Sequence, residues 1–225
     1  MKASAVIPAY NEAKRIGLVL NAVAASELVD EIIVVDDGSD DDTAAVAGSH
    51  NGAVVLKLLE NRGKAAALTE GVRRAKNPVV VFLDADLVGL TDQHVDGLVA
   101  PVLKGEADMT VGQFRSGSPF VTAWMRFCPA ISGQRAMRTA DFLAIPRVAT
   151  SGYGVEVVVT KYALSRRMRI EYVHLPDITH VVKESKRGVV RGLASRAVMY
   201  GQIVRSALGN GYHEFPETAQ ERDQR

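Results

Sequence analysis

Glu31-Ile-Ile-Val-Val-Asp-Asp-Gly-Ser39 is the clearest structural signal in this 225-residue chain. Its β-branched run is too short for a helix, and it ends in Asp, Gly and Ser, which favour turns. Asp and Ser can also cap a helix, so we expect one to begin near Thr43. The stretch therefore predicts a strand that leads directly into a helix.

The alternation of strand and helix continues on both sides of this stretch. Apolar runs predict strands over residues 3–8, 53–59 and 79–83, and helical spacing predicts helices over 12–25, 64–75 and 92–103. β-Branched strands separated by helices favour an α/β fold with a mostly parallel central sheet and helices on both faces. In such sheets ligands bind beyond the carboxyl ends of the strands, so the polar residues after each strand should meet at one rim.

The pattern is weaker in the second half of the chain. Strands are expected over 108–111, 152–160 and 169–174, and a helix over 188–208, whereas residues 113–135 show no clear period. No internal repeat or linker marks a domain boundary. We therefore expect one domain, with a polar and flexible tail over residues 211–225.

Composition favours a folded protein and excludes several classes. Apolar residues make up 47% of the chain and charged residues 24%, which suits one core and is too apolar for disorder. No apolar run approaches a membrane span and the N-terminus lacks a signal-peptide pattern, so we expect a cytoplasmic protein. Cys128 is the sole cysteine, which excludes an intramolecular disulfide and a thiolate zinc site.

The two parts of the chain differ in charge. Residues 1–100 contain 9 Lys/Arg and 15 Asp/Glu, whereas residues 101–225 contain 18 Lys/Arg and 11 Asp/Glu. The acidic part suits cations, and the basic part suits an anionic partner such as a phosphate or a lipid surface. Because no basic tract is interleaved with aromatic residues, a nucleic-acid partner is not expected.

Asp84-Ala85-Asp86 is the strongest chemical signal. On extended backbone, residues i and i+2 point to the same face, so both carboxylates could address one cation. Hard oxygen ligands suit Mg²⁺ or Mn²⁺, which would typically be shared with a diphosphate. A turn or helix-capping pair of aspartates is the alternative reading.

Other polar motifs leave two readings open. Asp36-Asp37 precedes Gly38-Ser39 as in an ordinary turn, but a carboxylate at a strand end can also accept hydrogen bonds from a base or ribose. Asn61-Arg-Gly-Lys64 lies before a helix, where backbone N–H groups and a lysine could hold phosphate, although it is not a P-loop. Taken alone, His180 is more often a structural histidine than a ligand.

Four motifs follow one another in the first part of the chain. They are Ile7-Pro-Ala-Tyr-Asn-Glu12, Val34-Val-Asp-Asp-Gly-Ser39 with Asp42-Thr43, Asn61-Arg-Gly-Lys64 and Leu83-Asp-Ala-Asp86. Together they resemble the GT-A family 2 glycosyltransferases. The resemblance implies the Rossmann-like GT-A fold, with residues 1–112 as the half that binds a nucleotide-sugar donor and residues 113–210 as the acceptor half of the same domain.

A narrower resemblance covers the second half. Ser132-Gly-Gln-Arg-Ala136, Gly152-Tyr-Gly-Val-Glu156 and His180 make the chain similar to dolichyl-phosphate mannosyltransferase-like enzymes and to glucosyl-3-phosphoglycerate synthase. This region is where such enzymes choose their acceptor.

The resemblance also implies roles for individual residues. The nucleotide pocket would be lined by Pro8, Tyr10, Glu12, Asp36, Asp37, Lys64, Asp84 and Ala85. The metal ligands would be Asp84, Asp86 and His180, and the sugar and acceptor region would include Gly133, Gln134, Arg135 and Tyr153. Asp86 and Glu156 would be catalytic, Asp86 through the metal and Glu156 as the base that deprotonates an acceptor hydroxyl.

The expected function is metal-dependent transfer of a sugar from a UDP- or GDP-linked donor to a hydroxyl or phosphate acceptor, with Mg²⁺ or Mn²⁺ as cofactor. Stereochemistry stays open, because the Glu-Asp base motif common among inverting relatives is absent and a phosphate acceptor would need no base. A sugar-phosphate nucleotidyltransferase would need a Gly-rich loop where this chain has Pro8-Ala-Tyr-Asn11. A non-catalytic nucleotide-sugar-binding module would not need the Asp84/Asp86 pair.

The segment 183–205 is basic and partly apolar. This pattern is found in solvated helix faces, in phosphate-binding elements and in membrane-surface contacts. We therefore keep a soluble anionic acceptor, a lipid-phosphate acceptor and peripheral membrane contact as alternatives. A homodimer is also compatible with the sequence.

Overall fold

The computed structural model describes residues 1–114, 132–150 and 154–180, which belong to one compact unit. Its strands are β1 (Ala3–Ala9), β2 (Val29–Asp36), β3 (Ala53–Lys57), β4 (Val79–Phe82), β5 (Leu87–Val88), β6 (Met109–Phe114), β7 (Arg135–Arg138), β8 (Ile170–Leu175) and β9 (Thr179–His180). Its helices are α1 (Ile16–Ala24), α2 (Thr43–Ser49), α3 (Lys64–Arg74), α4 (Asp92–Leu103), α6 (Thr139–Leu143) and α7 (Val155–Ser165). The expected helix over 188–208 and the tail over 211–225 lie outside the described residues.

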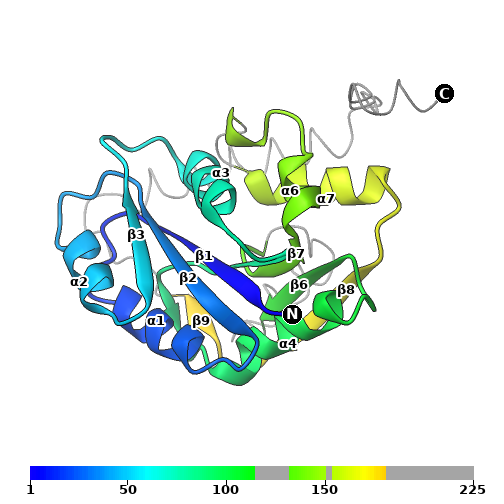
Figure 1. The fold of residues 1–225 in the computed structure, drawn as a ribbon, viewed down its shortest axis with the longest axis horizontal. Helices are drawn as coiled ribbons and strands as arrows, with labels where there is room; N and C mark the ends of the chain where they lie inside the picture. The colour runs from blue at the N-terminus through cyan, green and yellow to red at the C-terminus, as the bar shows by residue number, and fades with distance from the viewer. Residues whose placement is uncertain (115–131, 151–153, 181–225) are drawn as a thin grey trace, which may run out of the picture. The chain divides into compact units, whose positions relative to one another are not determined.

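Seven strands of the described residues form one sheet in the order β3-β2-β1-β4-β7-β6-β8 (Figure 1). β3, β2, β1 and β4 are parallel neighbours, and β8 is parallel to β6. β7 runs antiparallel to both β4 and β6. The predicted α/β fold with a mostly parallel sheet is confirmed. Strands on both sides of residue 112 share this sheet.

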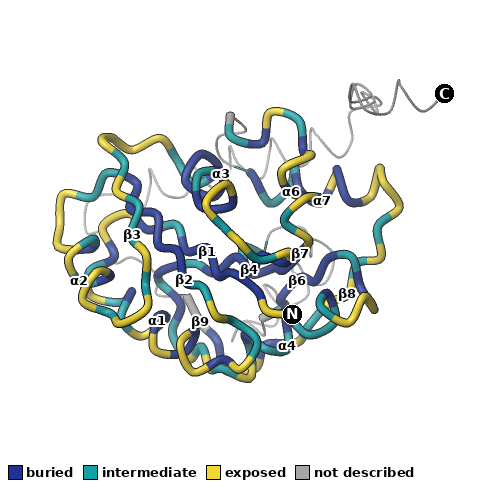
Figure 2. Tube along the Cα trace, viewed as in Figure 1, coloured by how far each residue is buried: buried dark blue, intermediate teal, exposed yellow. Residues whose placement is uncertain are grey.

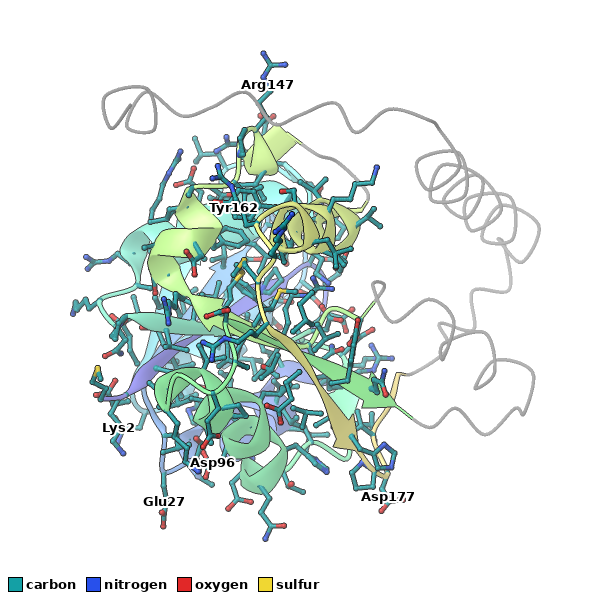
Figure 3. The ribbon with its side chains drawn as sticks, turned by 90° about the vertical axis from the view of Figure 1, so that its right-hand side faces the viewer. Lys2, Glu27, Asp96, Arg147, Tyr162 and Asp177 are labelled. Atoms are coloured by element: carbon teal, nitrogen blue, oxygen red, sulfur yellow. The ribbon has the colours of Figure 1, made fainter. Side chains whose placement is uncertain are left out.

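Helices cover both faces of the sheet. α1, α2 and α4 lie together on one face, and α3, α6 and α7 lie on the other (Figure 1). In Figure 3, Asp96 of α4 and Tyr162 of α7 mark these opposite sides.

The core lies along the central strands, which Figure 2 shows in dark blue. Because both faces are covered, successive residues are buried without alternation, and Val6, Ile7, Val34 and Val35 have no exposed surface. Within the three described ranges, no helix combines the length and the apolar character that crossing a bilayer requires.

Helix α3 approaches the sheet closely because Gly71 has no side chain. A Cβ at Gly71 would overlap Val6 Cγ1 and lie 3.1 Å from Val35 Cγ2. α3 is therefore packed directly on β1 and β2, and it begins at Lys64. The position of Lys64 at the rim of the sheet depends on this packing.

The strand expected over residues 152–160 is wrong, since Val155–Ser165 forms helix α7. The valine-rich run favours a strand by local propensity. Its buried residues instead recur at helical spacing, at Val155, Val159, Tyr162 and Ala163. Packing of this apolar face overrides the local preference.

The sequence pattern does not predict β7 or α6. β7 has only four residues, Arg-Ala-Met-Arg, which carry too little alternation to be recognised. It forms because β4 and β6 pair with it on either side. In this register Arg135 lies opposite Phe82, so β7 brings the motif that begins at Ser132 beside the end of β4.

We expect Gly71→Ala to destabilise the fold by about 1–2 kcal/mol, because the added methyl would overlap Val6 although Ala is the better helix former. Gly17→Ala in α1 is the matched control, since a Cβ there has nothing within 4 Å. It should be neutral or stabilise by up to about 1 kcal/mol. Urea unfolding measures both effects, and equal midpoints for the two variants would contradict this account of α3.

Candidate active site

Hydrogen bonds between backbone and side chains join the loops that follow β1 and β2. Asn11 N donates to Ser39 Oγ at 3.0 Å, and Glu12 N donates to Thr43 Oγ1 at 2.8 Å. The two loops therefore form one surface at the carboxyl ends of the strands. This contact agrees with the single rim expected from the sequence.

Asp36 and Asp37 are buried and hold backbone amides. Asp36 Oδ1 accepts from Ser39 N at 3.1 Å, as in a turn, and its buried Oδ2 has no hydrogen-bond partner among the described residues. Asp37 Oδ1 and Oδ2 accept from the N–H groups of Arg62 and Gly63, each at 2.8 Å. Asp37 thus ties the loop after β2 to the loop before α3. Contact of either carboxylate with a nucleotide stays a prediction.

Three other residues expected at the nucleotide, Pro8, Tyr10 and Glu12, lie in or just after β1. Pro8 lies beyond the β1–β4 pairing, which ends at Val6, and a strand tolerates a missing N–H there. Tyr10 is 41% exposed, whereas Glu12 is buried and paired with Arg15 at 2.9 Å. An exposed ring at the rim suits stacking on a base.

Lys64 lies between two carboxylates from distant parts of the chain. Its Nζ is 2.6 Å from Asp84 Oδ1 and 2.7 Å from Glu156 Oε1. Lys64 begins α3, Asp84 follows β4, and Glu156 lies in the first turn of α7. We call these three residues the Lys64 cluster. It joins the predicted donor half to the predicted acceptor half.

The two carboxylates keep Lys64 charged. Burial alone would lower the pKa of Lys64, but the charges of Asp84 and Glu156 raise it well above its usual value. The Lys64 side chain still exposes 33% of its surface, and those of Asp84 and Glu156 expose 21% and 17%. The cluster is therefore partly accessible from solvent.

The second oxygen of Asp84 is held by Gln134. Gln134 Nε2 donates to Asp84 Oδ2 at 2.8 Å. Gly133 lies against the same group, since a Cβ there would be 2.5 Å from Asp84 Oδ2 and 2.7 Å from Lys64 Nζ. Only glycine fits this position without displacing the ion pair.

Arg135 is buried and faces α7. Its Nη1 lies 3.2 Å from both Glu156 O and Thr160 Oγ1, and its Nη2 donates to Ser132 O at 2.6 Å. Burial lowers the pKa of Arg135 to about 10 in spite of the nearby carboxylates of Glu156 and Asp84. The guanidinium therefore stays charged at neutral pH.

The backbone brings His180 close to Asp86. β5 pairs with β9, and Leu87 lies opposite His180. The backbone of His180 is therefore beside the residue that follows Asp86, although the two residues are far apart in the sequence. Ligation of a metal by their side chains is not tested by this pairing.

The Asp84–Asp86 segment differs from the expected geometry. β4 ends at Phe82, and Ala85 and Asp86 form a turn, so the extended backbone assumed for a shared face is not present. Ala85 packs in the core, while Asp84 and Asp86 keep intermediate exposure. Among the described side chains, no three His, Cys, Asp or Glu gather as a metal site. Two carboxylates suit an ion that completes its coordination with a diphosphate.

Two further residues, Tyr153 and Thr160, differ in whether the sequence predicted them at the site. Tyr153 lies outside the described residues. Thr160 was not expected at the site, yet its Oγ1 donates to Glu156 O at 2.8 Å and contacts Arg135. The sequence signal that could have identified Thr160 is its spacing of four residues from Glu156, which places the two residues together only on a helix. The signal is not recognised because the sequence pattern predicts a strand over this stretch.

The family model described as glycosyl transferase family 2 matches residues 4–177. The match spans most of the chain, and the chain therefore belongs to glycosyl transferase family 2. The Lys64 cluster, the loops of the rim and β7 all fall within the matched residues. The expected family and the expected class of enzyme, a glycosyltransferase, are confirmed.

A curated relative matches less than half of the chain. A 4,4'-diaponeurosporenoate glycosyltransferase from Staphylococcus aureus is 37% identical over 99 residues, which are 42% of this chain and 26% of that protein. The chain thus spans about a quarter of the length of the curated relatives it matches.

Solved structures match a larger part. Glucosyl-3-phosphoglycerate synthase from Mycobacterium tuberculosis with Mn²⁺, UDP-glucose and phosphoglyceric acid has a TM-score of 0.72 and 28% identity, over 92% of this chain and 78% of that chain. The same enzyme with Mg²⁺ and UDP has a TM-score of 0.73 and 28% identity over the same shares. These similarities confirm the GT-A fold.

A double-mutant cycle should show that Lys64 and Asp84 interact strongly. We expect a coupling of about 1–2 kcal/mol between Lys64→Met and Asp84→Asn in urea unfolding, since removing one partner leaves a charge in a partly buried place. Arg73 and Glu70 provide the control pair, because they lie 3.3 Å apart on the more exposed face of α3. Their coupling should stay below about 0.5 kcal/mol. Equal couplings would mean that the Lys64 cluster is an ordinary surface contact.

Proposed function

We propose that this chain transfers a sugar from a UDP-linked donor to an anionic acceptor, with Mg²⁺ or Mn²⁺ bound beside the diphosphate. The observation that carries the proposal is the Lys64 cluster, in which one ammonium joins Asp84 to Glu156. Glycosyl transfer needs groups for the leaving diphosphate and a group at the acceptor, and this cluster contains candidates for both. UDP is favoured over GDP because the similar Mycobacterium tuberculosis structures contain UDP or UDP-glucose.

The proposed ligand residues fit a divalent cation that is shared with the nucleotide. Asp84 and Asp86 offer carboxylate oxygens, which Mg²⁺ and Mn²⁺ prefer, and His180 is the third proposed ligand. Both oxygens of Asp84 accept hydrogen bonds, from Lys64 and Gln134. We assign the more direct metal contact to Asp86, as the family resemblance implies. When bound, the ion would offset the negative charge that develops on the diphosphate as it leaves.

Residues of the chain supply the rest of the proposed chemistry. The ammonium of Lys64 adds positive charge beside the leaving diphosphate. Glu156 accepts the proton of an acceptor hydroxyl, because its carboxylate lies on the other side of the same ammonium. Tyr10 stacks on the base from its exposed position at the rim.

Two observations support an anionic acceptor. Residues 101–225 contain 18 Lys/Arg against 11 Asp/Glu, and a similar solved structure contains phosphoglyceric acid. A soluble phosphate ester and a lipid phosphate share this chemistry, and peripheral membrane contact would accompany only the second. We favour the soluble ester. A homodimer is a separate prediction that this chemistry does not require.

Nucleotide binding should require a divalent metal, because Asp84 and Asp86 would otherwise face a diphosphate of the same sign. We expect UDP to raise the melting temperature only with Mn²⁺ or Mg²⁺, and GDP to have a smaller effect. Asp86→Ala should stay folded but lose both this shift and donor turnover. Asp92→Ala, at the start of α4, is the control and should keep both.

Two results would contradict this part of the proposal. A larger thermal shift with GDP would overturn the choice of nucleotide. Undiminished turnover of the Asp86→Ala variant in metal-free buffer would overturn the metal-dependent reaction itself.

The class of acceptor can be tested with the preferred UDP-sugar. We expect transfer to 3-phosphoglycerate or a related soluble phosphate ester, and we expect the protein to stay in the soluble fraction when it is floated with anionic liposomes at low salt. Mass spectrometry of the product identifies the acceptor. Flotation together with transfer to a polyprenyl phosphate would instead establish the lipid acceptor.

A further inference from the structure

We infer that Gln134 and Arg135 are positioning residues, which hold the carboxylate of Asp84 and the backbone of Glu156 and do not contact the acceptor themselves. The inference rests on the proposed function, since it concerns how Asp84 and Glu156 are held for that reaction. Gln134 has no exposed surface and Arg135 is 2% exposed. Neither side chain therefore presents a surface on which a ligand from solvent could lie.

The amide of Gln134 is fixed in one orientation. Its Nε2 donates to Asp84 Oδ2 at 2.8 Å, and its Oε1 accepts from Ser132 Oγ at 3.1 Å. If the amide turned over, its oxygen would face the carboxylate of Asp84, and two acceptors would meet without a proton. Because Lys64 takes the other oxygen of Asp84, the carboxylate is held at both ends.

The guanidinium of Arg135 performs the same task for α7. It reaches Glu156 O and Thr160 Oγ1 with Nη1, and Ser132 O with Nε and Nη2. Thr160 Oγ1 also donates to Glu156 O at 2.8 Å, so that carbonyl receives a second side-chain donor. These bonds fix the first turn of α7, from which the Glu156 side chain extends to Lys64.

The pairing of β7 explains why two neighbouring residues reach both carboxylates. Arg135 lies opposite Phe82 on β4, so the residues before Arg135 run past the end of β4 toward Asp84. The side chain of Gln134 thus points toward Asp84, whereas the side chain of Arg135 points toward α7. The start of β7 is a rigid link between the two halves of the proposed site.

The first test concerns Gln134 and metal binding. Gln134→Met keeps the volume of the side chain but removes the donor. We expect the affinity for Mn²⁺, measured by electron paramagnetic resonance of free Mn²⁺ in the presence of UDP, to fall about 10-fold or more. Gln93→Met, on the exposed surface of α4, is the control and should bind as the wild type does. Ser132→Ala removes the hydroxyl that orients the amide and should weaken Mn²⁺ binding in the same direction.

The second test concerns Arg135 and turnover. Arg135→Lys keeps the charge but cannot hold all three oxygen atoms, because an ammonium lacks the planar fork of a guanidinium. We expect unchanged affinity for UDP with Mn²⁺ and a kcat for donor turnover about 10-fold lower. Arg138→Lys, on the same strand but paired with Asp108, is the control. Thr160→Val provides a second variant that should act in the same direction if Arg135→Lys does not fold.

Non-additivity separates positioning from a general structural role. If Arg135 acts through Glu156, the double variant Arg135→Lys/Glu156→Gln should lose no more kcat than Glu156→Gln alone. Additive losses in this cycle would overturn the role of Arg135. Folded Gln134→Met and Ser132→Ala variants with wild-type affinity for Mn²⁺ would overturn the role of Gln134.

The proposed function fails in a different way. Wild-type protein that binds neither UDP nor Mn²⁺ would overturn the proposed function, and this inference with it. Wild-type protein that binds both, with variants that match it, would overturn this inference alone.

Discussion

One ammonium group between two carboxylates organises the rim of this sheet. Asp84 and Glu156 lie within hydrogen-bond distance of Lys64 Nζ, and the two carboxylates could not both approach this point without a cation, because like charges in a partly buried place repel. The arrangement requires that the start of α3, the end of β4 and the first turn of α7 meet. Packing and hydrogen bonds from residues outside the Lys64 cluster hold these elements in place.

The packing of α3 is the first of these supports. Gly71 lets the helix lie directly on β1 and β2, and Asp37 accepts two backbone N–H groups from the loop before Lys64. Asp37 and Asp84 are therefore acids of different kinds, although both follow a strand in the acidic part of the chain. Both carboxylate oxygens of Asp37 accept hydrogen bonds from backbone amides. Asp84 instead contacts the ammonium of Lys64 and is partly exposed to solvent. The two acids thus differ in partner and exposure, because backbone amides hold the buried Asp37 whereas an ammonium and a side-chain amide hold the partly exposed Asp84.

The antiparallel strand β7 is the second support. A purely parallel sheet would place a crossover between β4 and its neighbour, whereas β7 inserts its own start beside the end of β4. Gln134 and Arg135 stand at that start, with one side chain on Asp84 and the other on α7. The start of β7 is thus joined to both Asp84 and α7 through buried polar contacts. In low-dielectric surroundings such contacts hold their geometry, because an unpaired group would be costly.

The amino-acid sequence by itself determined the alternation of strand and helix, the mostly parallel sheet and the rim to which the motifs belong, because β-branched runs, helical spacing and turn residues are local signals. It also supported the family and singled out Lys64, Asp84 and Glu156, each with a separate role. Only the tertiary structure decided that these three share one ion-pair cluster. It also decided that Val155–Ser165 is a helix and that four residues suffice for β7, since contacts between distant segments supply the free energy that local propensity lacks.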